Sequence, residues 1–123
     1  MDKGKTFSAV DTFLAFRRLE KLRREAHEVW DEAGIDALIV PTASVTPTIK
    51  EVMEVPVGIN TVLGLYTNFV NLLDLCGIAV PNGFLPYGQP TGITIIGKAF
   101  DDHFVYQVIH FFIFLFFSFF YIF

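Results

Sequence analysis

A helical repeat of apolar residues, closed by a glycine and followed by a short apolar run, constrains the fold more than any other feature. Ser8 and Asp11 form a capping-box pattern where the repeat begins, and Gly34 is a natural C-terminal cap. The apolar run Asp36–Thr42 is stopped by Pro41, as expected for a buried strand of a parallel or mixed sheet. This succession predicts α/β packing. The repeat consists of Val10, Phe13, Leu14, Leu22, Ala26, Val29, Trp30 and Ala33.

Charged residues are concentrated at the start of the chain, where seven Lys and Arg balance seven Asp and Glu up to Ala33. The formal net charge of the whole chain is -4, and no basic stripe follows this helix, so the composition gives no support for a nucleic-acid partner. In the helix, Glu20, Glu25 and Glu28 interleave with the basic residues, which favours a solvated, salt-bridged face over an anion-binding surface. The basic residues are Arg17, Arg18, Lys21, Arg23 and Arg24.

Proline and glycine divide the middle of the chain into short elements. A loop from Ala43 to Val57 contains Pro47 and Pro56, which are expected to block regular structure apart from one helical turn at Ile49–Met53. A central helix is then predicted to run from Thr61 or Leu65 to Cys76.

Gly77 is expected to end that helix, and two short strands and a last helix follow. The first strand, Ile78–Val80, is closed by Pro81-Asn82-Gly83, and the second, Thr91–Gly97, is β-branched and apolar. A proline- and glycine-rich turn joins them, so they can be neighbours in a sheet. The last helix is predicted to begin at Asp101 or Asp102.

Amide and hydroxyl side chains stand among apolar residues in the segment Asn60–Phe84. Buried polar groups need hydrogen-bond partners. These side chains therefore either hold neighbouring segments or face a pocket, and the sequence leaves both interpretations open. They belong to Asn60, Thr67, Asn68 and Asn71.

No complete active site is visible as a motif. Cys76 is the single cysteine and lies in an apolar run, which favours a small buried hydrophobe. His27 lacks a second histidine four residues later, where Asp31 stands, so no metal site is predicted. A catalytic serine needs a base in reach, and neither Ser8 nor Ser44 has one nearby in the sequence.

Five sequence blocks occur in an order and spacing typical of a known family. They are Phe7–Phe13, Asp36–Thr42, Tyr66–Leu75, Ala79–Phe84 and Gly88–Gly97. Together they resemble the C-terminal part of amidase-signature enzymes over residues 7–103. The similarity is closest to allophanate hydrolase, in which a Tyr-Thr-Asn-Phe-Val-Asn-Leu-Leu-Asp segment is characteristic.

The resemblance implies a fragment of an α/β/α layered fold, with a mixed sheet and flanking helices. It also implies hydrolysis of a small-molecule amide by the intact enzyme, without metal or organic cofactor. The family uses a serine nucleophile, a second serine and a lysine, all from segments that match nothing in this sequence. No catalytic residue is therefore carried over, and we expect the chain alone to be inactive.

The resemblance does carry over a pocket wall. In related enzymes the segment that enters the central helix faces the acyl side of the substrate site. That segment corresponds here to Asn60, Thr61, Gly64, Thr67 and Asn68. Internal hydrogen bonding of these residues is the alternative interpretation.

The family pattern is expected to cover residues 1–107, and residues 108–123 depart from it. Eight of the thirteen residues from Phe111 to Phe123 are phenylalanine. One hypothesis is that this tail, expected as an apolar helix, is translated non-coding sequence. The alternative is a C-terminal membrane anchor, because Phe104–Phe123 has about the 20 residues that a span needs. We expect a cytoplasmic protein, membrane-anchored if the tail inserts. A non-catalytic interaction module is the other alternative function.

Overall fold

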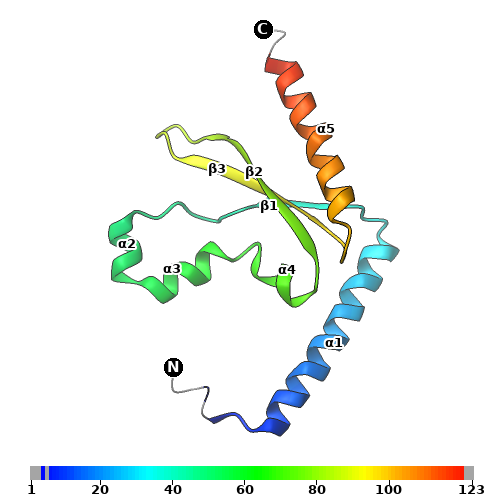
Figure 1. Cartoon of the computed structure of the whole chain (residues 1–123). Helices are drawn as coiled ribbons and strands as arrows, with labels where there is room; N and C mark the ends of the chain where they lie inside the picture. The colour runs from blue at the N-terminus through cyan, green and yellow to red at the C-terminus, as the bar shows by residue number, and fades with distance from the viewer. Residues whose placement is uncertain (1–3, 5, 121–123) are drawn as a thin grey trace. The chain divides into compact units, whose positions relative to one another are not determined.

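The computed structural model describes Gly4 and residues 6–120, and the side chains of these residues as far as Phe114. The chain divides into two compact units, Met1–Ile35 and Asp36–Phe123, and each is described by itself. Figure 1 shows one long helix in the first unit, and a small sheet with several helices in the second.

The first unit is built on helix α1, Ala9–Glu32. The predicted capping box is confirmed: the Asp11 amide donates to Ser8 Oγ at 3.2 Å, and the Ser8 amide donates to Asp11 Oδ2 at 2.8 Å. Gly34 follows the helix with φ 62°, and the Ile35 amide donates to the Trp30 carbonyl at 3.0 Å, which completes a Schellman motif.

Ion pairs on the surface of α1 confirm the prediction of a salt-bridged face. Lys21 Nζ lies 3.4 Å from Glu25 Oε1, and Arg23 Nη1 lies 3.0 Å from Glu20 Oε1. Both pairs join residues one helical turn apart.

The second unit contains a three-stranded sheet made of β1 (Leu38–Pro41), β2 (Cys76–Phe84) and β3 (Pro90–Gly97). The strand order is β1-β3-β2, and both pairings are antiparallel. The predicted parallel or mixed sheet is therefore wrong for the strands within this chain. The tight turn between β2 and β3 permits only antiparallel pairing, and β1 then adds to the free edge of β3.

Strand β2 is longer than the sequence indicated. It continues through Pro81 to Phe84, with a shift of register between Pro81 and Gly83. Gly83 has φ 138°, a conformation that glycine adopts without strain. Pro81 itself is paired with Gly92. Because β2 lies at an edge of this sheet, where proline is tolerated, Pro81 does not end the strand.

Three short helices occupy the connection between β1 and β2: α2 (Ile49–Glu54), α3 (Pro56–Leu63) and α4 (Asn68–Leu72). The helical turn at Ile49–Met53 is confirmed. Pro56 does not block regular structure but stands at the first position of α3, where its missing N–H is harmless.

The single central helix predicted to end at Gly77 is wrong. The helix is interrupted after Leu63, because glycine at position 64 is a weak helix former, and α4 ends before Asp74. Asp74 has φ 60°, and the Leu75 amide donates to the Val70 carbonyl at 3.0 Å. Asp74 thus ends the helix in the left-handed position where a glycine is usual, and Gly77 lies within β2.

Helix α5 (Asp102–Phe120) begins where predicted and continues without interruption past Gln107. It contacts β2 and β3 (Figure 1). Ile95 of β3 packs with Val105 and Ile109 of α5, and these three buried side chains form the hydrophobic core of this unit. The amphipathic start of the helix therefore holds the sheet from one face, and Ile109 of the predicted tail belongs to that core. Residues 121–123 of the tail lie outside the described residues.

Candidate functional site

The five residues predicted to line a pocket lie on α3, on α4 and in the link between them. On α3 the polar side chains bond to their own helix: Asn60 Nδ2 donates to the Pro56 carbonyl at 2.9 Å, and Thr61 Oγ1 donates to the Val57 carbonyl at 3.0 Å. Both side chains are exposed. Each keeps oxygen lone pairs that can accept a further hydrogen bond.

The link between the two helices is built around Gly64. Its carbonyl accepts the amides of Thr67 at 3.0 Å and of Asn68 at 2.8 Å. A Cβ at position 64 would stand 2.6 Å from Asn68 Cγ, so the Asn68 side chain occupies the space that any larger residue would need. Asn60, Thr61, Gly64, Thr67 and Asn68 thus form one continuous corner of backbone.

A hydrogen bond from a serine in the loop after β1 connects this corner to the sheet. Ser44 Oγ donates to the carbonyl of Val62 on α3. Nearby, Thr42 and Thr94 share a hydrogen bond of 2.9 Å between their hydroxyls, and the Thr42 amide donates to the Gly92 carbonyl at 3.0 Å. These bonds connect the loop after β1 to both α3 and β3.

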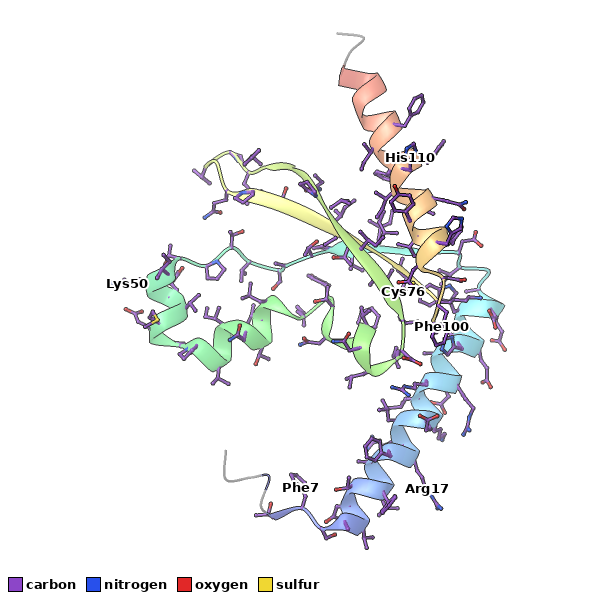
Figure 2. The ribbon with its side chains drawn as sticks, in the orientation of Figure 1. Phe7, Arg17, Lys50, Cys76, Phe100 and His110 are labelled. Atoms are coloured by element: carbon purple, nitrogen blue, oxygen red, sulfur yellow. The ribbon has the colours of Figure 1, made fainter. Side chains whose placement is uncertain are left out.

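The chemistry available at the corner is neutral hydrogen bonding. The five residues have amide, hydroxyl and backbone groups but no ionisable side chain, so they can orient a substrate but cannot transfer a proton at neutral pH. The nearest charged residues in the sequence are Glu54 before the corner and Asp74 after it. On α2, Lys50 Nζ is 3.9 Å from Glu54 Oε1. Lys50 projects from the outer side of α2 (Figure 2).

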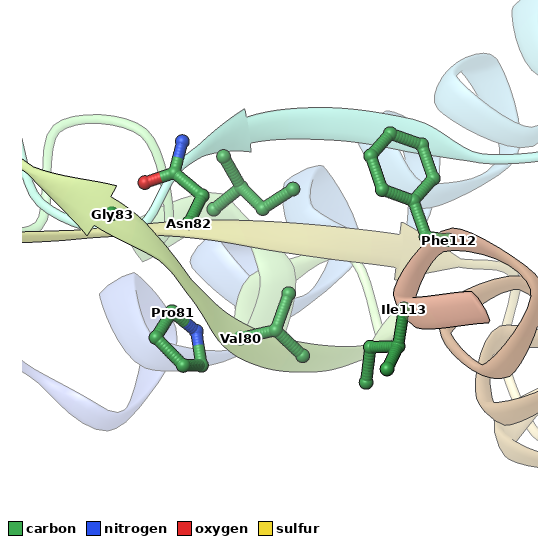
Figure 3. A pocket seen from close by; sticks show the side chains of 7 residues that line it. Val80, Pro81, Asn82, Gly83, Phe112 and Ile113 are labelled. Atoms are coloured by element: carbon green, nitrogen blue, oxygen red, sulfur yellow. The ribbon is translucent and has the colours of Figure 1, made fainter. Parts of the chain in front are cut away.

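A separate apolar cleft of about 360 Å³ lies between the bulged end of β2 and the far part of α5. Figure 3 shows Phe112 and Ile113 of α5 facing Val80 and Pro81 across it. Asn82 also lines it, and the Asn82 side-chain oxygen accepts from Thr91 Oγ1 at 2.6 Å. None of the five predicted wall residues lines this cleft. The sequence did not reveal it, because it needs both the extension of β2 and the continuation of α5.

Cys76 packs against the hydrophobic core as the sequence favoured, but it is half-buried rather than fully buried. Its thiol donates to the Lys98 carbonyl at 3.0 Å. Burial, with a contribution from the negative charge of Asp102, raises the pKa of the Cys76 thiol. A raised thiol pKa leaves little thiolate at neutral pH, so this cysteine is a poor nucleophile.

Two further classes of site are absent from the described part of the chain. There, no three His, Cys, Asp or Glu side chains gather in a way that would hold a metal ion. Within residues 4 and 6–120, no helix combines the length and hydropathy of a membrane span.

Comparison with known proteins decides the family. The sequence profile of the family described as Amidase matches residues 2–105. The chain belongs to the amidase family. This confirms the resemblance seen in the five sequence blocks, and the match ends within the first turn of α5.

Two amidase relatives show how far the sequence similarity extends. The chain is 44% identical over 107 residues to urea amidolyase of Saccharomyces cerevisiae, a match that covers 84% of this chain and 6% of that protein. It is 33% identical over 101 residues to a glutamyl-tRNA(Gln) amidotransferase subunit from a Chelativorans species, covering 80% of this chain and 20% of that protein. The chain therefore spans a small part of the amidase relatives that it matches.

The backbone of the chain also matches a solved structure of an amidase relative. A serine-to-alanine variant of Kluyveromyces lactis allophanate hydrolase matches with a TM-score of 0.75 and 40% identity, over 82% of this chain and 16% of that one. The α/β arrangement with its small antiparallel sheet is thus a piece of an amidase fold, close in sequence to allophanate hydrolase.

Proposed function

We propose that this segment serves, within an intact amidase, the hydrolysis of the C–N bond of a urea-derived amide such as allophanate. The observation that carries the proposal is the match to Kluyveromyces lactis allophanate hydrolase, at 40% identity and a TM-score of 0.75 over 82% of the chain. The 44% identity to urea amidolyase supports the same substrate class, since the amidotransferase protein of the Chelativorans species is only 33% identical.

In the proposed reaction, a serine hydroxyl attacks the amide carbonyl and loses its proton to a base. The C–N bond breaks, the nitrogen receives a proton, and ammonia leaves an acyl-enzyme that water then hydrolyses. The serine, the base and the oxyanion donors come from parts of the amidase domain outside this segment. The role proposed for Asn60, Thr61, Gly64, Thr67 and Asn68 is to form the wall on the acyl side of the substrate.

The chain by itself is proposed to lack amidase activity. Its two serine hydroxyls outside the tail have structural hydrogen bonds: Ser8 Oγ donates to Asp11 Oδ2 at 2.6 Å, and Ser44 Oγ donates to the Val62 carbonyl. Neither bond resembles the pairing with a lysine that the family mechanism needs. Ammonia release from allophanate by the purified chain, above a buffer control, would contradict this part of the proposal.

A chimera tests the function directly. Residues 2–105 replace the matched segment in wild-type Kluyveromyces lactis allophanate hydrolase, and ammonia release from allophanate is measured. We expect an active enzyme. In this chimera, Thr61→Val removes a wall hydroxyl at nearly constant volume, and kcat/KM is expected to fall roughly tenfold, the equivalent of one hydrogen bond to substrate.

Asn71→Ala is the matched control, because Asn71 is also an exposed polar residue of this segment but lies outside the proposed wall. Its kcat/KM is expected to stay unchanged. A well-folded chimera without activity would refute the proposed function. Equal kcat/KM values for the two variants would refute the pocket wall alone.

A further inference from the structure

The connection from α2 to α4 presents an unusually apolar exposed surface. Six of its large apolar side chains are more than half exposed. Within these three helices, all of whose residues the structure describes, no residue is buried. We call these six side chains the α2–α4 surface: Ile49, Met53, Val55, Val57, Leu65 and Leu72.

The sequence of this connection indicates a buried interface. Residues 55–73 contain no Asp, Glu, Lys, Arg or His. Charged residues stand only at its two ends, where Glu54 pairs with Lys50 before it and Asp74 follows it. Single exposed hydrophobics are ordinary, but a long uncharged stretch with many exposed apolar side chains is typical of a surface that another protein covers.

The short helices also need an external partner for stability. They have eight residues or fewer, and helices of that length are unstable in water without tertiary packing. The main contacts of α3 are with α2, and those of α4 are with β2. Most of this connection therefore has little of its own unit to pack against.

The apolar surface is continuous with the corner that holds the proposed pocket wall. Ile49 and Met53 lie one turn apart on α2 and share a face, as do Val57 and Thr61 on α3. A partner that covers Val57 would consequently reach Thr61. This connects the covering of the apolar surface with the completion of the substrate site.

We propose that the α2–α4 surface binds the remaining part of an amidase domain, and that it does so even when that part is a separate chain. This inference rests on the proposed function. It commits to this occupant because the backbone of the chain recurs, with a TM-score of 0.75, in a hydrolase of which it covers only 16%. That protein has ample further chain to cover the surface.

The test uses the full chain and wild-type Kluyveromyces lactis allophanate hydrolase from which the matched segment has been deleted. The two chains are co-expressed, and their association is measured by affinity co-purification and sedimentation. We expect a 1:1 complex that releases ammonia from allophanate. Failure of the unaltered chain to co-purify would overturn the proposal.

Two variants test whether the surface is responsible. Val57→Asp combined with Leu65→Asp places charges at its centre, and we expect at least a tenfold loss of affinity. Ile49→Asp is a second variant that is expected to fold, because an acidic residue is favourable in the first turn of a helix. Tyr87→Asp is the control: Tyr87 is also exposed, but it lies in the turn between β2 and β3.

The remaining outcomes separate this inference from the proposed function. Equal binding by the surface variants and by the Tyr87→Asp control would overturn the inference. So would a homodimer of the chain that the same variants dissociate, since the occupant would then be a second copy. A complex that needs the surface but releases no ammonia would count against the proposed function and leave the docking surface standing. If the single-chain chimera is active but the separate chains do not associate, the proposed function stands and the docking surface is refuted.

Discussion

Gly97, at the end of β3, lies directly beneath Val105 of α5. A Cβ on Gly97 would stand 2.5 Å from Val105 Cγ2 and 3.2 Å from Cys76 Sγ. Val105 is fully buried, so it cannot move aside into solvent. The absence of a side chain at position 97 is therefore what lets the helix approach the sheet.

Gly97→Ala is expected to lower the free energy of unfolding by about 1–3 kcal/mol, the usual cost of overpacking a core. Denaturant unfolding followed by circular dichroism measures the change. Combining it with Val105→Ala should recover part of the loss, because the smaller side chain makes room. Gly77→Ala is the control: a Cβ there meets only ordinary contacts, the nearest at 3.4 Å. Equal losses for Gly97→Ala and Gly77→Ala would show that the close approach is unimportant.

Ile109 tests whether the start of the Phe-rich tail belongs to the folded core. Its side chain is 6% exposed and packs with Ile95 and Val105, whereas that of Tyr106 on the same helix is 60% exposed. Ile109→Ala is expected to cost about 2–5 kcal/mol of the free energy of unfolding, and Tyr106→Ala less than about 0.5 kcal/mol. Chemical denaturation of both variants measures these changes in the free energy of unfolding. A loss at Ile109 as small as that at Tyr106 would place the start of the tail outside the core.

Asp74 holds a left-handed conformation with φ 60° at the end of α4. Glycine adopts this conformation without the steric cost that Cβ brings. Asp74→Gly is therefore expected to raise the free energy of unfolding by about 0.5–1 kcal/mol. Gly34 has φ 62° after α1, so Gly34→Ala should lower the free energy of unfolding. Thermal melting of the two variants checks both signs, and a destabilised Asp74→Gly would mean that the carboxylate has a role of its own.

The capping box of α1 predicts a dependence of helicity on pH. The Ser8 hydroxyl and the Ser8 amide both donate to Asp11 and hold the pKa of its carboxyl below the ordinary value. Because the folded-state pKa is lowered, the stabilisation is complete above the unfolded pKa of about 3.9 and disappears as pH falls through the folded pKa. Helicity at the start of α1 should decrease accordingly on acidification.

A titration of the Asp11 carboxyl by nuclear magnetic resonance tests the cause of this pH dependence. Ser8→Ala is expected to bring the pKa of Asp11 back toward its ordinary value, because the hydroxyl donor is lost. Ser8→Thr keeps the hydroxyl and should preserve the lowered pKa. Identical Asp11 titrations in the two variants would exclude the hydroxyl as the cause.

The sequence by itself determined the local features of this protein and its family. Helix α1 was predictable because its caps, Ser8 with Asp11 and then Gly34, act within one or two turns of the residues that they serve. The family was predictable because five blocks recur in order, and the match over residues 2–105 confirmed it.

Only the tertiary structure decided which strands pair and where the long elements end. The antiparallel sheet depends on β3 lying between β1 and β2, a choice made by contacts far apart in the sequence. Pro81 within β2 defeated a local rule, because β2 lies at an edge of this sheet and an edge strand tolerates proline. The break at Gly64 followed the weak helix propensity of glycine, but the hydrogen bonds that join α3 to α4 there are seen only in the structure. The packing of Val105 on Gly97 and the apolar cleft beside Phe112 likewise exist only once α5 lies against the sheet.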